Sequence, residues 1–555
     1  MLCSHSWAPE SESQMGSLAV ISPISHSEYS KAAMKILAPV LCSVLVGLLV
    51  PVKGFCQTPR DSKPLIAIFI VDGLRPDSIN TLDTPTIARL RKEGVEYLNS
   101  HSIFPTVTRV NATALATGTY PVLNGIVGNS MFVSGVNQRT AFDTGDYKQL
   151  LKLEQVSGRI ATVETLGEIL QRNRRKLVTV SSGSTGNGFL LNPTAAHGNG
   201  IAIHGLFDPG KTAAYPKQIS DAVIQRFGSP PSERDEIGLM NWTDNVLREY
   251  VLQDLLPDVV IDWEGPLDSA QHANGVGSPQ AKEALHQIDQ SISRTISKIE
   301  ALGLLSRTDI IIGSDHGFAH NTDAVNLLDK LVTAGLKKAA NSTDIILASQ
   351  GQSILLYLMP EEREKLGKLV GFLQQQPSVD LIFTRNGKDG LGSVPGTFSL
   401  DLISASHPSR AADVVVSMAW TSKPNPYGVR GTQTINSNMT GRLPGVVSGH
   451  GGLNPWVIHN TFLAWGADFK KQTRIDVPVS LADVTPTVLT LLGIDVEESN
   501  AGRGRILREV MKGAAAATTR KRVLKTSAGS YEASLQISTA AGHDYIDTGS
   551  RQRAK

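Results

Sequence analysis

The sequence predicts an α/β fold in which a mostly parallel sheet carries helices on both faces. Two observations support this prediction. Apolar runs of strand length recur along the chain, and helical patterns lie between them. The first run, residues 64–71, is apolar throughout, which is typical of a strand buried on both faces. Strands that alternate with helices favour βαβ units, whose strands are parallel.

The other elements follow in order. Residues 84–92 are predicted to form a short helix, and a second helix is predicted to begin at Thr108 and to stop at Gly118. The clearest helix is 281–302, because its large aliphatic residues form one apolar stripe. A further helix is predicted at 481–492. The remaining strand candidates are residues 176–181, 258–262, 308–313, 412–418 and 461–465.

Composition divides the chain into three parts. Residues 58–510 are predicted to form the main domain, with an insertion at about 129–238. This insertion is rich in Gly, Ser, Thr and Asn and lacks strong periodicity, so we expect loops or a lid over a site. Residues 511–555 are rich in Ala and Thr and then basic, and we expect a peripheral or disordered end.

Residues 1–57 are predicted to be a leader. Within the segment 34–56, Met34 and Lys35 precede a mostly apolar run, residues 36–50. This run matches the apolar core of a signal peptide and is short for a membrane span. We therefore expect an exported protein, periplasmic or secreted, whose true start is Met34. The alternative is an amino-terminal membrane anchor, so that contact with a membrane would come only through an uncleaved leader.

Charge and cysteine content argue against a nucleic-acid partner and against sites built on cysteine. The 53 basic residues nearly balance the 51 acidic ones, and no long basic block precedes the carboxyl-terminal end, so nucleic acid is not expected as the main partner. The cysteines, Cys3, Cys42 and Cys56, all precede the first predicted strand. The main domain therefore has neither a thiolate metal site nor a catalytic cysteine, and a metal would need histidine and carboxylate ligands.

The stretch from Ile103 to Asn111 contains a candidate nucleophile. If a helix begins at Thr108, then Thr108 and Asn111 face the same way at its first turn. Free N–H groups and the positive end of the helix dipole also gather there, which suits an anionic phosphoryl group. The alternative is that Thr108 merely caps an ordinary helix.

Carboxylates and histidines recur where a shared site is expected. Most of them follow predicted strands, and functional residues of such sheets gather at the carboxyl ends of the strands. Three aspartates and three histidines form two sets of three ligands, which suits a pair of divalent ions, zinc above all. The candidates are Asp72, Asp268, His272, Asp315, His316 and His450.

From about residue 64 to 508 the chain resembles the nucleotide pyrophosphatase/phosphodiesterase branch of the alkaline phosphatase superfamily. The motifs, in order, are Val71-Asp72-Gly73, Phe104-Pro105-Thr106-x-Thr108-x-x-Asn111, Thr117-Gly118-x-Tyr120-Pro121-x-x-x-Gly125-Ile126, Asp268-x-x-x-His272, Asp315-His316-Gly317 and Gly449-His450-Gly451. The resemblance implies an alkaline-phosphatase-like fold with loop or lid insertions and two zinc ions. The implied ligands are Asp268, His272 and His450 for one ion, and Asp72, Asp315, His316 and Thr108 for the other. It also implies that Asn111 helps to hold a phosphoryl oxygen.

The implied activity is hydrolysis of phosphodiester or pyrophosphate bonds in small phosphorylated substrates such as nucleotides. A threonine hydroxyl is a poor nucleophile at neutral pH, but coordination to a cation lowers its pKa. We therefore expect a phosphothreonine intermediate on Thr108. A non-catalytic binding protein of the same fold is an alternative from another class.

Arg109 departs from the family, whose phosphodiesterases usually carry an aromatic residue directly after the nucleophile. Its guanidinium can stack on a base or grip a phosphate bidentately. A grip on phosphate favours a phosphomonoesterase or phosphonate hydrolase of the same superfamily. A third alternative is that Arg109 points away and pairs with a surface acid.

Overall fold

The computed structural model describes residues 64–232, 234–437, 446–499 and 502–552. The predicted leader, residues 1–57 with its signal-like segment 34–56, lies outside these ranges. The described residues all belong to one unit that begins at Arg60. No helix in these ranges is long and apolar enough to cross a membrane.

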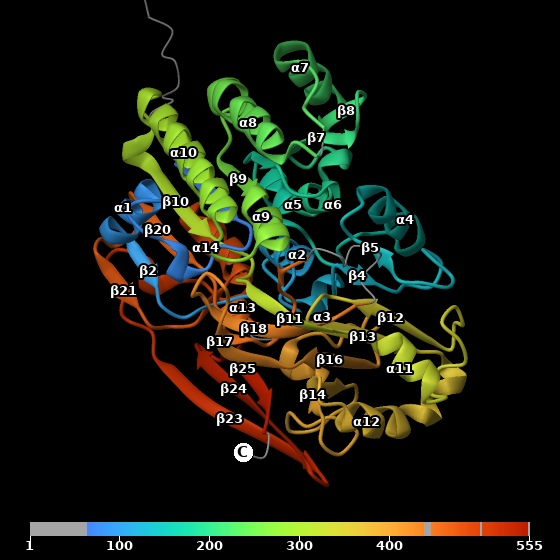
Figure 1. The fold of residues 1–555 in the computed structure, drawn as a ribbon. Helices are drawn as coiled ribbons and strands as arrows, with labels where there is room; N and C mark the ends of the chain where they lie inside the picture. The colour runs from blue at the N-terminus through green and yellow to red at the C-terminus, as the bar shows by residue number, and fades with distance from the viewer. Residues whose placement is uncertain (1–63, 233, 438–445, 500–501, 553–555) are drawn as a thin grey trace, which may run out of the picture. The chain divides into compact units, whose positions relative to one another are not determined.

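A nine-stranded sheet forms the centre of the structure (Figure 1). In spatial order its strands are β21 (Thr473–Ile475), β2 (Val95–Tyr97), β20 (Phe462–Gly466), β10 (Thr308–Gly313), β1 (Leu65–Val71), β9 (Val259–Glu264), β6 (Leu177–Ser181), β7 (Ile201–Asp208) and β8 (Thr212–Tyr215). The five strands from β10 to β7 are mutually parallel, whereas β20 and β8 run antiparallel to their neighbours. The predicted mostly parallel sheet is therefore confirmed.

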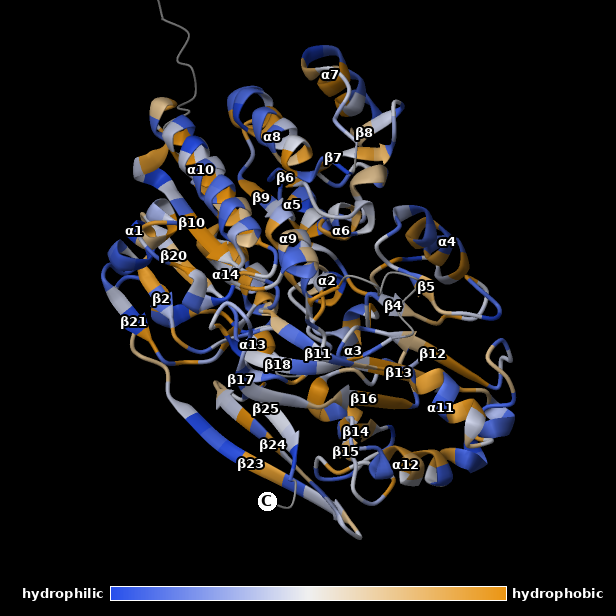
Figure 2. Cartoon of the chain, viewed as in Figure 1, coloured by the Kyte–Doolittle hydropathy of each residue, from blue (hydrophilic) through white to orange (hydrophobic). Residues whose placement is uncertain are grey.

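Helices cover both faces of this sheet, as predicted. Leu65, Ala67 and Phe69 of β1 pack in one apolar core, and Ile66 and Ile68 pack in another. Helices on the first face are α1 (Pro85–Glu93), α7 (Lys217–Phe227), α8 (Glu236–Val246), α9 (Pro266–Asn274) and α10 (Pro279–Ala301). Those on the second are α2 (Thr108–Thr117), α5 (Leu166–Arg172) and α14 (Val484–Leu491). In Figure 2, α10 carries hydrophilic and hydrophobic residues side by side, as its predicted stripe requires.

A second layer of sheets lies outside the central one. The strand predicted at 412–418 exists, but it pairs in a separate and mainly antiparallel five-stranded sheet. That sheet consists of β12 (Ile345–Ser349), β13 (Ser353–Leu358), β16 (Val414–Met418), β14 (Val379–Thr384) and β15 (Phe398–Ser399), with helices α11 (Leu327–Thr333) and α12 (Leu366–Gln375). A four-stranded sheet contains β17 (Trp420–Pro424), β18 (Arg430–Asn436), β11 (Ala319–Val325) and β19 (Ser448–Gly449).

The structure corrects the prediction for residues 129–238. This region supplies β6, β7 and β8 to the central sheet, so most of it is not a loop-rich insertion. Its glycine- and asparagine-rich flanks hid the strand β7, which is buried along almost its whole length. The smaller elements in or near this region are α3 (Pro121–Asn124), β4 (Ser130–Met131), β5 (Phe142–Asp143), α4 (Tyr147–Ser157) and α6 (Thr185–Leu190).

For residues 511–555 the sequence predicted a peripheral or disordered end, and the part that the structure describes is ordered. Three antiparallel strands, β23 (Thr519–Ala528), β24 (Tyr531–Ala540) and β25 (His543–Arg551), form a sheet there. Tyr531, Leu535 and Ile537 are buried in the same apolar core as Phe383 of β14. Apolar and polar residues alternate from Tyr531 to Ser538, and the apolar ones are buried. This strand signal was present in the sequence, but the Ala/Thr-rich and basic composition of the end outweighed it in the prediction.

Candidate active site

The predicted metal ligands meet at one edge of the central sheet. Asp72 directly follows β1, and Asp315 and His316 follow β10, which is its parallel neighbour. Asp268 and His272 lie on α9, the helix that follows β9. Because the carboxyl ends of parallel strands coincide, these local positions bring the side chains together.

His450 reaches the same place from a turn after β19 (Ser448–Gly449). The next residue, Gly451, has a φ of 106°, and a Cβ atom there would lie 1.7 Å from the backbone oxygen of Gln350. Only glycine fits at this position, so the glycine after His450 is a geometric requirement of the turn.

One group of ligands surrounds the candidate nucleophile. The Nε2 atom of His316 lies 3.1 Å from Asp315 Oδ2 and 3.5 Å from Asp72 Oδ1. Ligand atoms of these three residues lie within 4.8 Å of one another. The Oγ1 atom of Thr108, the first residue of α2, lies 3.3 Å from the same Nε2 atom.

The second group adjoins the first. The Nε2 atoms of His272 and His450 lie 3.5 Å and 3.6 Å from Asp268 Oδ1. The rings of His316 and His450 stack with centroids 3.6 Å apart. Ligand atoms of Asp268, His316 and His450 also fall within 4.8 Å of one another. His316 therefore lies between the two groups, and all six predicted ligands form one continuous cluster.

The histidines are oriented as metal ligands are. Their Nδ1 atoms lie 2.9 to 3.2 Å from backbone carbonyl oxygens, of Ser448 for His272, of Gly317 for His316 and of Thr106 for His450. A carbonyl oxygen only accepts, so each Nδ1 carries the proton and each Nε2 keeps a lone pair. Such a contact fixes the ring and the tautomer in metal sites.

In each of the three carboxylates, at least one oxygen accepts no hydrogen bond from the described residues. The Trp263 Nε1–H donates to Asp72 Oδ2 at 3.0 Å, and the Gly73 N–H donates to Asp315 Oδ1 at 3.1 Å. Asp72 Oδ1, Asp268 Oδ1 and Asp315 Oδ2 are buried and have no hydrogen-bond partner among the described residues.

Without cations, the negative charges of these buried and closely spaced carboxylates are destabilised. Burial, and then the nearest other carboxylates, raise the pKa values of Asp72, Asp268 and Asp315 well above the usual range. Burial lowers the pKa values of His316 and His450 well below theirs. Buried carboxylates and neutral imidazoles with lone pairs facing one space are stabilised by cations, so the residues fit bound divalent metal ions.

Arg109 pairs with a surface acid. Its guanidinium is mostly buried, and Nη2 lies 3.8 Å from an oxygen of the exposed Asp143. This pairing is the third alternative that the sequence left open. The guanidinium is nevertheless close enough to the cluster to hold down the pKa values of Asp72 and Asp268, against the larger effect of burial.

The structure contradicts the prediction for Asn111. Its side chain is fully buried, and Oδ1 accepts from the Ile103 N–H at 2.9 Å. Nδ2 donates to Ser102 Oγ and to the Val107 carbonyl, both at 3.0 Å. Because its amide is committed inside the fold, Asn111 positions the segment that leads into α2 and does not hold a phosphoryl oxygen.

Asn129, and not Asn111, reaches the backbone beside Thr108. Its Oδ1 accepts from the backbone N–H of Arg109 at 3.0 Å, which fixes the amide beside Thr108. The side chain of Gln350 accepts from the Asn129 N–H at 2.6 Å and holds the loop in place. Asn129 is half-buried. No local spacing could have connected it to Thr108, since α2 and a loop separate them.

Comparison with known proteins agrees with this geometry. Residues 66–378, more than half of the 555-residue chain, match the family model of type I phosphodiesterase / nucleotide pyrophosphatase. Among the similar proteins is bis(5'-adenosyl)-triphosphatase enpp4 of Mus musculus, 26% identical over 49% of this chain and 51% of the relative. Ectonucleotide pyrophosphatase/phosphodiesterase family member 1 of Homo sapiens is 23% identical over 47% of this chain and 24% of the relative.

A solved structure is also similar. It is murine ectonucleotide pyrophosphatase / phosphodiesterase 5, an inactive variant in complex with AMP, and it has a TM-score of 0.53 and 16% sequence identity. The match covers 79% of this chain and 97% of the murine one, and it shows a shared fold. The chain spans about half the length of the first curated relative.

Proposed function

The chain belongs to the type I phosphodiesterase / nucleotide pyrophosphatase family, and from this premise we propose that it is an exported zinc-dependent hydrolase. It cleaves phosphodiester or pyrophosphate bonds in nucleotide-type substrates. The observation that supports this most directly is the Thr108 hydroxyl, 3.3 Å from His316 Nε2 within the cluster of six ligands. Similarity to a bis(5'-adenosyl)-triphosphatase and to a structure solved in complex with AMP favours nucleotides.

Thr108 is the proposed nucleophile. When bound by the two ligand groups, zinc ions lower the pKa of this hydroxyl and neutralise charge that develops on the phosphoryl group. Thr108 Oγ1 forms a bond to phosphorus while the bond to the leaving oxygen breaks, and a phosphothreonine results. Water then attacks the phosphorus, releases the phosphoryl product and restores the hydroxyl.

Asn129 is the proposed donor to the phosphoryl oxygens. Its Oδ1 is occupied by the Arg109 N–H, so its NH₂ group is the part left to serve a ligand beside Thr108. The amino end of α2 adds the positive end of a helix dipole at the same place. Together they stabilise the negative charge that the transition state spreads over the equatorial oxygens.

A phosphomonoesterase or phosphonate hydrolase is the second candidate. The observation that favours it is the guanidinium of Arg109, which is mostly buried and electrostatically coupled to the metal ligands. A doubly charged monoester gains more from that charge than a diester does. The complete ligand set and Thr108 argue against a binding protein without turnover.

Hydrolysis of an aryl phosphodiester and an aryl phosphomonoester by the zinc-loaded protein, with Thr108→Ala as the control, tests the proposal. We expect the diester to be preferred and the variant to be inactive. Preference for the monoester would establish the second candidate, and absence of turnover with bound zinc would favour a binder. Mass spectrometry of the mature amino terminus tests export, because cleavage within residues 34–56 is expected.

A further inference from the structure

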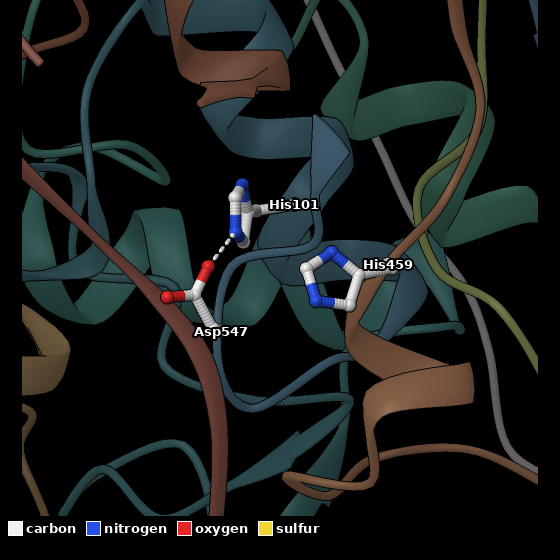
Figure 3. A group of neighbouring side chains, drawn as sticks. All are labelled: His101, His459 and Asp547. Carbon is white, nitrogen blue, oxygen red and sulfur yellow. Dashed lines mark hydrogen bonds and ion pairs between the residues drawn. The ribbon is translucent and has the colours of Figure 1, made fainter. Parts of the chain in front are cut away.

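Outside the active site, two histidines and an aspartate of the kinds that hold metal ions lie together (Figure 3). His101 is in β3 (Ser100–His101), His459 directly follows α13 (Pro455–Ile458), and Asp547 is in β25 of the carboxyl-terminal sheet. Ligand atoms of the three residues lie within 4.8 Å of one another. In Figure 3 the two rings and the carboxylate converge from three separate segments of the chain.

The three side chains are held on a rigid frame. His101 and His459 form a β-bridge, which continues as a hydrogen bond from the Ser102 N–H to the Ile458 carbonyl at 2.7 Å. The hydroxyl of Ser538 in β24 lies 2.9 Å and 2.8 Å from the two oxygens of Asp547. The bridge holds the backbones of the two histidines side by side, and Ser538 holds the carboxylate of Asp547, before any ion binds.

An ion pair explains only part of this arrangement. His101 Nε2 lies 2.8 Å from Asp547 Oδ1, with ring centroids of His101 and His459 4.8 Å apart. His459 is a second, half-buried imidazole beside this pair, and in its neutral form it brings a further nitrogen ligand without adding charge. The Nδ1 atom of His101, a residue only 1% exposed, also has no hydrogen-bond partner among the described residues.

We propose that His101, His459 and Asp547 bind a third divalent cation, of the borderline class that accepts imidazole and carboxylate together, with zinc as the first choice. Three such ligands and one water molecule would fill the four positions of a tetrahedral zinc ion, with bonds of about 2.0–2.1 Å. The ligand atoms now lie within 4.8 Å of one another, so the ion would draw the three side chains together.

The cation has a structural role in this proposal. Asp547 lies in the carboxyl-terminal sheet, whereas His101 begins the segment that leads through Ser102 to the buried Asn111 and to α2. A metal that joins them ties the last 40 or so residues to the segment before the nucleophile. Because the unfolded chain lacks this site, the cation stabilises the folded state.

Metal counting on the purified full-length protein, dialysed after zinc loading, tests the site. His459→Gln and Asp547→Asn are each expected to lose one metal per chain and to melt at a lower temperature than the wild type. His197→Gln is the matched control, because His197 also pairs with an acid, Glu154, at 2.9 Å but is 57% exposed. It should keep the wild-type count. Equal metal content in all four proteins would overturn the proposal.

Crystals of the wild-type protein provide a measurement that does not depend on folding of the variants. Anomalous scattering on the two sides of the zinc absorption edge should give a peak between His101, His459 and Asp547, in addition to peaks at the active site. Peaks at the active site alone would refute the third cation. Peaks at the three-residue cluster alone would leave it standing and refute the proposed function, so the two failures are distinguishable.

Discussion

Replacing Asn129 and Asn111 in turn by alanine separates catalysis from stability. Asn129 is half-buried, and its proposed contact is with the transition state. Loss of one such donor typically lowers kcat by about a hundredfold or more. We therefore expect Asn129→Ala to lose about two orders of magnitude in kcat and less than about 1 kcal/mol in the free energy of unfolding.

Asn111→Ala has the opposite expected profile. It leaves the buried Ile103 N–H without a hydrogen-bond acceptor and removes the hydrogen bonds to Ser102 and to the Val107 carbonyl. A buried polar group without a hydrogen-bond partner costs about 1–3 kcal/mol. Because several such groups lose their partner, the free energy of unfolding should fall by about 2–5 kcal/mol. The residual folded protein keeps its catalytic groups, so kcat should change little.

Steady-state hydrolysis of an aryl phosphodiester and urea denaturation followed by circular dichroism measure the two quantities. Metal content is determined for both variants, since loss of an ion would mimic a catalytic defect. The reasoning would be refuted if Asn111→Ala lost about a hundredfold in kcat at unchanged stability while Asn129→Ala remained active. That result would return the oxygen-binding role to Asn111.

Three further predictions follow from burial and charge. Leu535→Ala leaves a cavity at a fully buried position of β24 and should lower the free energy of unfolding by about 2–5 kcal/mol in urea denaturation. Val523, on the neighbouring strand, is 56% exposed, so Val523→Ala should change that free energy by less than about 0.5 kcal/mol. Equal effects would show that the terminal sheet is no part of the core. Burial beside Asp468 raises the pKa of Asp309 to about 7. Between about pH 4 and pH 7 the folded protein therefore keeps a proton that the unfolded chain has released. The free energy of unfolding should fall with rising pH over this range, by up to about 4 kcal/mol. Asp309→Asn should remove that fall when unfolding is compared at pH 5 and pH 8, and an unchanged slope would contradict the assignment. Arg109→Gln should reduce kcat/KM for an aryl phosphomonoester by about tenfold more than for the diester, as expected from loss of a charge-assisted contact, and equal losses would show that the guanidinium does not touch substrate.

The sequence by itself predicted that the six candidate metal ligands and Thr108 lie together. Asp72 and Asp315 sit at the ends of strands whose apolar runs are visible in the chain, and parallel neighbours place those ends at one edge. His450 is followed by Gly451, which its turn requires. Where a side chain's position follows from its place on a regular element, residue order is sufficient to predict the site.

The tertiary structure decided everything that depends on contacts between distant segments. In a helix the Cα–Cβ bond tilts toward the amino end, so Asn111 turns back onto the residues that precede α2, and a loop brings Asn129 to Thr108 instead. The terminal sheet is part of the core because Leu535 is buried in the same apolar cluster as Phe383. No local pattern around either residue indicates that the two segments pack together. Helical spacing and strand alternation predict which nearby residues share a face. They do not predict which distant segments pack together, because that depends on the tertiary fold.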